Sequence, residues 1–114
     1  MKIYSNKRKN TICQNTKIAK SFSSRLKGLL GLNSFTNFDG LLLINCRQIH
    51  SIGMKFIFDA IYLDKNYKIL SKYSNIAKNK ILPYNINAKY VLELPSGTIE
   101  KYALQIDEYL EFEE

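Results

Sequence analysis

The sequence predicts an α+β fold that is mainly β: a small curled antiparallel sheet or half-barrel of about six to seven strands with one or two packed helices. Three observations lead to this prediction. Short segments rich in β-formers recur between turn residues, whereas only one segment has a clear helical period. The chain has 114 residues and 46% apolar content, which is enough to bury a core. We therefore expect a single domain over residues 1–114.

The N-terminal part is expected to form short strands, and it is followed by the best helix candidate. Residues 1–18 surround a polar turn at 5–10, with a strand core at 11–13. The helix is predicted over 21–31, because Ser21 can cap its start and Gly31 can end it. Its apolar residues fall at i, i+4, i+7 and i+8, which places them on one stripe. They are Phe22, Leu26, Leu29 and Leu30.

The remaining elements are short. The run LLLI at 41–44 predicts a buried strand, and 56–63 predicts a longer, central strand packed against the helix. A turn at 64–66 indicates a hairpin into residues 67–70. Further along the chain we expect a loop at 83–87, a strand at 90–94, a short helix at 98–105 and a last strand at 109–112.

The sequence indicates a cytoplasmic protein with reduced thiols. Cys13 and Cys46 form no metal-binding or redox spacing, and the basic N-terminus lacks the apolar region of a signal peptide. No run approaches the length of a membrane span. We expect no disulfide, no cofactor and no metal.

The net charge of +7 is unevenly placed along the chain. Residues 65–90 contain six lysines and no acid, whereas residues 91–114 contain seven acids and one lysine. The lysines are dispersed and no recognition motif accompanies them, so any nucleic-acid binding is expected to be weak and non-specific. Such a role requires exposed tyrosine near Lys20, Lys27, Lys78 and Lys80 on one face.

A set of short motifs resembles a known prokaryotic family. In order along the chain they are Ala19, Arg25, Gly28-Leu29-Leu30, Gly40, His50, Met54, Asp59, Leu63-Asp64, Pro83, Ala88, Val91-Leu92-Glu93-Leu94-Pro95, Gly97 and Asp107. Their order and spacing over about residues 11–112 resemble the uncharacterised "domain of unknown function 192" family. The resemblance implies a mostly β fold with a packed helix, and it implies no activity.

Three positions depart from the pattern of that family. Leu30 stands where Met is usual, Gly53 where an aromatic residue usually precedes the Met, and Ile106 where Gly usually precedes the Asp. If the missing aromatic residue lines a pocket in the family, the pocket is altered in this chain.

Asp59 is the sharpest local anomaly. In an extended strand it shares a face with Ile57, Ile61 and Leu63. A carboxylate on an aliphatic face needs a partner, because burial without one costs several kcal/mol. Arg25, His50 and loop amides are the candidates, and a structural pairing is weighed against a functional acid. Together Arg25, His50, Met54 and Asp59 form the candidate pocket.

Cys46, Asp64 and Glu93 are secondary candidates. Cys46, His50 and Met54 recur every four residues, which would align three soft ligands on a helix, but Gly53 interrupts such a helix and the set is incomplete. Cys46 is either a nucleophile paired with His50 or a small buried residue. Glu93 lies opposite Leu92 and Leu94, either at the surface or neutralising a basic group such as Arg25.

Three functions remain open. The leading hypothesis is a small non-catalytic module that binds an unassigned small-molecule or protein ligand. The alternative is a small hydrolase or transferase using Cys46, His50 or Asp59, which requires these groups to converge in a concave site. The third is a weak, non-specific nucleic-acid binder.

Overall fold

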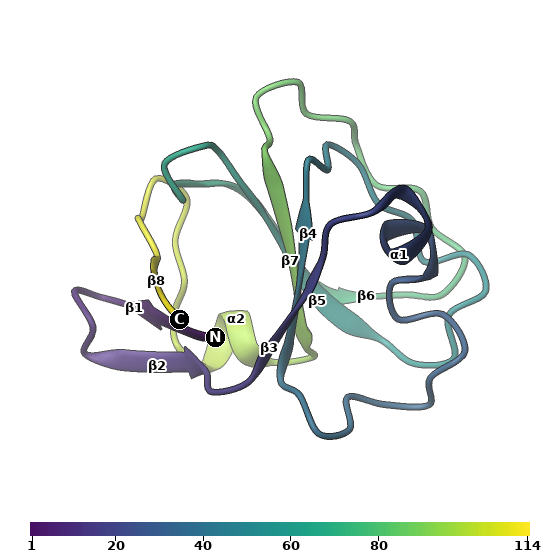
Figure 1. Cartoon of the computed structure of the whole chain (residues 1–114), viewed down its shortest axis with the longest axis horizontal. Coiled ribbons are helices and arrows are strands. Elements are labelled where there is room, and N and C mark those ends of the chain that lie inside the picture. Colours follow the sequence, from purple (N-terminus) through teal and green to yellow (C-terminus); the bar gives the residue numbers. More distant parts are fainter.

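Two β-sheets and two short helices make up the fold (Figure 1). The structure is a computed structural model that describes the backbone of residues 1–114 and every side chain except those of Phe22 and Leu26. The chain termini meet in the smaller sheet, where Lys2 pairs with Glu113. Neither described helix has the length and apolar character needed to cross a membrane.

The smaller sheet has the order β2-β1-β8 and the larger sheet has the order β3-β4-β7-β5-β6. All neighbouring strands are antiparallel except β3 and β4, which are parallel. The strands are β1 (Lys2–Ser5), β2 (Asn10–Cys13), β3 (Thr16–Ala19), β4 (Gly40–Ile44), β5 (Phe58–Leu63), β6 (Ile69–Ile76), β7 (Tyr90–Pro95) and β8 (Glu111–Glu113). The helices are α1 (Phe22–Lys27) and α2 (Thr98–Lys101).

The mainly β class is confirmed, but the predicted single curled sheet is confirmed only in part. There are eight strands in two sheets, and the sheets do not join into a closed barrel. The larger sheet is also not fully antiparallel. The connection between β3 and β4 contains α1 and is long enough to return the chain to the same end of the sheet, which is what a parallel pair requires.

The core is divided by the larger sheet into two clusters. On one face, β4, β5 and β7 pack against the smaller sheet and α2; this cluster includes Leu42, Ile61 and Leu92. On the other face, the same strands pack against the segments that follow α1 and β4; this cluster includes Leu43 and Phe58. Alternation along the strands therefore assigns each side chain to one face or the other.

β5 is an interior strand, as predicted. It lies between β7 and β6, and all six of its residues are buried. The hairpin from β5 into β6 is also confirmed, and its turn is closed by the amide of Tyr67, which donates to the carbonyl of Asp64. The last helix and the last strand are both shorter than predicted.

α1 is shorter than the predicted helix. Ser21 caps its start with a reciprocal capping box, as expected, but the helix ends at Gly28 rather than at Gly31. Gly28 has a φ of 45°, a conformation that favours glycine. Leu29, which follows the helix, is buried in the same cluster as Phe58, Ala60 and Tyr62 of β5, and Leu30 packs against that cluster. The predicted contacts of Phe22 and Leu26 lie outside the described side chains.

Gly40 lies where β4 passes close to the thiol of Cys13. A Cβ atom at this position would lie 2.7 Å from Cys13 Sγ, which is well inside van der Waals contact. We predict that Gly40→Ala lowers the free energy of unfolding by about 1–3 kcal/mol, the usual cost of overpacking. Urea unfolding measures this cost. If the clash is the cause, Gly40→Ala should cost much less in a Cys13→Ala background, and an equal cost in both backgrounds would contradict this explanation.

Candidate functional site

A cavity of about 240 Å³ opens on the face of the larger sheet that α1 covers. It is formed by the end of α1 with the turn after it, by the strands β4 and β7, by the loop 45–50 after β4, and by Met54. Its apolar wall comprises Leu29, Leu30, Leu43, Ile49 and Met54, and its polar lining comprises Arg25, Lys27, Asn45, Cys46, Arg47, Gln48, His50 and Glu93. We call this space the Glu93 cavity.

Glu93 is the most unusual group in the cavity. Its position on β7 is opposite Ala60 on β5 and Leu41 on β4, so its nearest cross-strand neighbours are apolar. Only 5% of the residue is exposed. Its Oε1 atom is buried and has no hydrogen-bond partner among the described groups. Burial raises the pKa of Glu93 to about 8, so the carboxyl is largely protonated at neutral pH.

The turn after α1 covers this carboxyl closely. A Cβ atom on Gly28 would lie 3.6 Å from Glu93 Oε1, so the backbone of Gly28 passes directly over the buried oxygen. Arg25 does not neutralise Glu93. Its Nη1 atom donates instead to the carbonyls of Lys20, at 3.0 Å, and Ile44, at 3.2 Å. The described ion pairs include neither Arg25 nor Glu93.

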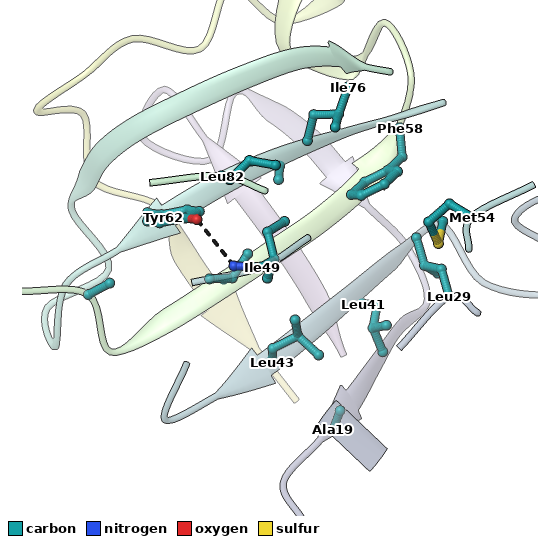
Figure 2. Close-up of a cluster of buried hydrophobic side chains, with 13 residues drawn as sticks. Ala19, Leu29, Leu41, Leu43, Ile49, Met54, Phe58, Tyr62, Ile76 and Leu82 are labelled. Carbon is teal, nitrogen blue, oxygen red and sulfur yellow. Dashed lines mark hydrogen bonds between the residues drawn. The ribbon is translucent and has the colours of Figure 1, made fainter. Parts of the chain in front are cut away.

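The loop 45–50 is held in place by a buried tyrosine. The Tyr62 hydroxyl donates to the carbonyl of Pro83 at 2.9 Å and accepts from the amide of Ile49 at 3.3 Å, the contact drawn in Figure 2. Burial raises the pKa of Tyr62 to about 12, so the hydroxyl keeps its proton. The wall of the cavity is therefore tied to β5 rather than left as an unsupported loop.

His50 lies at the exposed edge of the cavity. Its Nδ1 atom accepts a hydrogen bond from the amide of Ile52 at 3.1 Å, and its backbone forms an isolated bridge with Ile81. His50 is thus a loop residue whose ring accepts a hydrogen bond from the backbone.

Cys46 also lines the cavity, but its thiol is not activated. Burial raises the pKa of Cys46 and the charge of Glu93 adds to this, whereas a backbone hydrogen bond of Gln48 and the charge of Arg25 partly oppose it. The Cys46 thiol itself donates to the carbonyl of Gln48 at 3.3 Å. No hydrogen bond between Cys46 and His50 occurs among the described side chains. These two residues therefore form no nucleophile–base pair in this conformation.

Met54 is buried beside Leu29 in the apolar cluster (Figure 2). The segment from Cys46 to Met54 is not helical, and Gly53 has a φ of 84°. The helical alignment of Cys46, His50 and Met54 is therefore absent. Within the described part of the chain, no three His, Cys, Asp or Glu residues are grouped closely enough to hold a metal ion.

Asp59 is separated from the other members of the candidate pocket. It lies opposite Leu94, on the sheet face that packs against α2, whereas Glu93 lies on the reverse face. It is fully buried, and its two oxygens accept three backbone amides. These are the amides of Asn75 at 2.8 Å, Gly97 at 3.1 Å and Ile99 at 3.0 Å.

The partners of Asp59 are therefore backbone amides near the end of β6 and at the start of α2, and not Arg25 or His50. Because Ile99 lies in the first turn of α2 and Gly97 precedes it, the carboxylate caps this helix from a distant strand. Asp64 also has a local role, since its Oδ1 atom accepts the amides of Asn66 and Lys68 in the hairpin turn. The structure thus brings together Arg25, His50, Met54, Cys46 and Glu93, and it places Asp59 and Asp64 elsewhere.

Sequence reasoning underestimated Glu93 and missed Gly28 as a residue of the site. The face of Glu93 was predicted correctly, since Leu92 and Leu94 pack on the opposite side. Its burial was not predicted. The available signal was its position in the run Val91–Pro95, where a strand buried on both faces leaves no surface for a carboxylate.

Comparison with known proteins supports the fold and the family. A structure from Novosphingobium aromaticivorans DSM 12444, described as a protein of unknown function, has a TM-score of 0.80 and 13% identity, over 98% of this chain and 84% of that one. A structure from Sinorhizobium meliloti 1021, described as a putative transcription regulator, has a TM-score of 0.79 and 18% identity, over 96% and 89%. No curated protein matches the chain.

The family comparison covers nearly the whole chain. The model of the DUF192 family, described as "Uncharacterized ACR", matches residues 3–112, which include the whole larger sheet, the Glu93 cavity and all of the smaller sheet except its end residues Lys2 and Glu113. The chain therefore belongs to the domain of unknown function 192 family, a family without an assigned function.

Proposed function

We propose that this chain is a non-catalytic binding module whose ligand is a small organic molecule held in the Glu93 cavity. The observation that supports this most directly is the buried Oε1 atom of Glu93 without a hydrogen-bond partner. Leaving such a group unpaired costs about 1–3 kcal/mol of stability. Because Glu93 lines an open cavity, a ligand hydroxyl, amide or carbonyl in that cavity can form a hydrogen bond with its carboxyl group.

The shape and lining of the cavity are consistent with this role. Its volume of about 240 Å³ suits a metabolite-sized molecule. Five aliphatic or thioether side chains supply apolar contact, while a few polar groups can orient the ligand. Catalysis by Cys46, His50 and Asp59 is not favoured, because Asp59 lies on the opposite face of the sheet and Cys46 keeps its proton.

A fragment screen observed by ¹H–¹⁵N NMR tests the proposal. Neutral, anionic and cationic fragments at millimolar concentration should include some that shift the amides of residues 28–30, 45–50 and 93. Glu93→Leu should weaken those fragments that present a hydrogen-bonding group, because the polar partner is gone. The proposal fails if no fragment shifts these amides, or if Glu93→Leu leaves every affinity unchanged.

Weak nucleic-acid binding is a second candidate, supported by the six lysines and no acid of residues 65–90. Lys20, Lys27, Lys78 and Lys80 are all exposed, and so is Tyr84. We predict that any affinity for random oligonucleotides collapses between about 50 and 200 mM salt, as counterion release requires. Fluorescence anisotropy measures this, and tight, sequence-dependent binding at the higher salt concentration would contradict it.

We also propose that the protein is cytoplasmic, where its thiols remain reduced. Cys13 is buried among apolar residues of one cluster, whereas Cys46 packs against the other cluster, and both are free. We predict that alkylation of denatured protein, purified without reductant, labels both thiols. Mass spectrometry that found a stoichiometric Cys13–Cys46 disulfide would exclude this placement.

A further inference from the structure

Three basic side chains line the Glu93 cavity, and none of them is neutralised. Arg25, Lys27 and Arg47 all contribute to its lining, and among the described lining residues Glu93 is the only acid. None of the three forms an ion pair with a described side chain. The neighbouring sequence supplies no other acid, since residues 40–58 contain neither Asp nor Glu. The opening therefore has an excess of positive charge that attracts anions.

The two guanidinium groups are held in place by backbone carbonyls. Arg25 donates to Lys20 and Ile44 through a single nitrogen, Nη1, and Arg47 donates to Ile86 through Nε. A guanidinium carries five N–H donors, so each retains donors for a ligand. Groups positioned before binding lose less entropy when a ligand arrives, and their planar shape matches a carboxylate or a phosphate.

The inner end of the cavity has a different character. Burial alone shifts Glu93 toward its neutral form, and no neighbouring cation opposes this shift. None of the three basic groups forms an ion pair with Glu93 among the described side chains. A neutral carboxyl both donates and accepts a hydrogen bond, and it does not repel an anion. The cavity thus combines a neutral polar base with a cationic opening.

We propose that the ligand of the Glu93 cavity is an organic anion, with its carboxylate or phosphate at Arg25 and Arg47 and a hydroxyl or carbonyl at Glu93. An apolar body between these ends contacts Leu29, Ile49 and Met54. This inference rests on the proposed binding function and specifies the class of its ligand. A cationic ligand would instead meet three positive charges at the opening and an uncharged carboxyl at the base.

A matched set of probes tests the class of ligand. 4-Hydroxybenzoate, 4-hydroxybenzamide and 4-hydroxybenzylamine share one ring and one hydroxyl but differ in charge, and 4-hydroxyphenyl phosphate distinguishes a phosphate from a carboxylate. Probes of this size reach dissociation constants of about a millimolar. NMR titration should find at least one of the two anions bound about tenfold more tightly than the amide, as charge-assisted hydrogen bonds allow.

Substitutions in the chain test which side chains of the cavity bind the anionic probes. Arg47→Gln should weaken the anions several-fold and leave the amide unchanged, whereas Lys9→Gln, a charge removed from the distant β1–β2 turn, should change nothing. Glu93→Gln should keep anion binding, because glutamine also donates and accepts, and Glu93→Leu should reduce it. If the amine binds best and Glu93→Gln abolishes its binding, the anion class is wrong although the site remains. If no probe and no fragment binds, both proposals fail.

Discussion

Glu93→Gln should remove a large pH dependence from the stability of this protein. Burial raises the pKa of Glu93 from 4.5 to about 8 in the folded state. Between these values the folded state binds a proton that the unfolded state has released, so the free energy of unfolding decreases as the pH rises. The slope is about 1.4 kcal/mol per pH unit for one proton. The glutamine variant does not ionise and should lack this slope.

The wild-type protein should therefore lose about 3–5 kcal/mol relative to Glu93→Gln between pH 4.5 and about pH 9, and the difference should level off above that. This is a large part of the stability of a domain of this size. Urea unfolding of both proteins across this range measures the difference, and other titrating groups cancel in the comparison. Parallel curves for the two proteins would show that the Glu93 carboxyl is hydrated and ionises as it does in water.

Asp59→Ala should be among the most destabilising substitutions of a polar residue in this chain. The change removes the acceptor of three backbone amides, two of which belong to the start of α2. We expect a loss of about 3–5 kcal/mol in the free energy of unfolding, because each hydrogen bond to a charged group contributes about 1.5–3 kcal/mol and the losses are not additive. Chemical unfolding monitored by circular dichroism measures this loss.

Asp59→Asn should cost about half as much. Its single oxygen can still accept hydrogen bonds from Gly97 and Ile99, but its NH₂ group then faces the backbone N–H of Asn75, so two donors meet.

Asp64→Ala is the matched control, since Asp64 also accepts two amides but lies in a half-exposed turn. It should cost about 1 kcal/mol. Equal costs for Asp59→Ala and Asp64→Ala would contradict the structural role of Asp59. If Asp59→Asn lost probe binding while its free energy of unfolding stayed unchanged, Asp59 would have a functional rather than a structural role.

Asp59 and Glu93 show the limits of what local pattern can predict about a carboxylate. Both lie on interior strands that are buried on both faces, and their faces follow directly from alternation. Nothing in the alternation indicates which carboxylate meets backbone donors. The amides of Asp59 come from residues 16 to 40 positions away, whereas Glu93 lies under a turn whose backbone presents no donor to its Oε1 atom.

The pocket expected from the sequence and the Glu93 cavity share residues but are not the same set. Arg25, His50 and Met54 were grouped from their motifs, and all three line the cavity. Glu93 is only a secondary candidate on the evidence of the sequence. Asp59 belongs to the expected pocket because a buried carboxylate needs a partner, but the sequence does not show which face of the sheet supplies that partner.

The sequence by itself determined the mainly β class, most strand positions and the faces of residues 57–63 and 92–94, because these depend on periods of two residues and on local turn chemistry. The order and spacing of its motifs determined the family. Only the tertiary structure decided that the N-terminal hairpin pairs with the C-terminal strand as a separate sheet, and that α1 ends at Gly28. It also decided that Glu93 remains buried and unpaired while Asp59 caps α2. These features depend on contacts between residues far apart in the chain, and a local pattern of side chains does not encode which distant backbone will meet which strand.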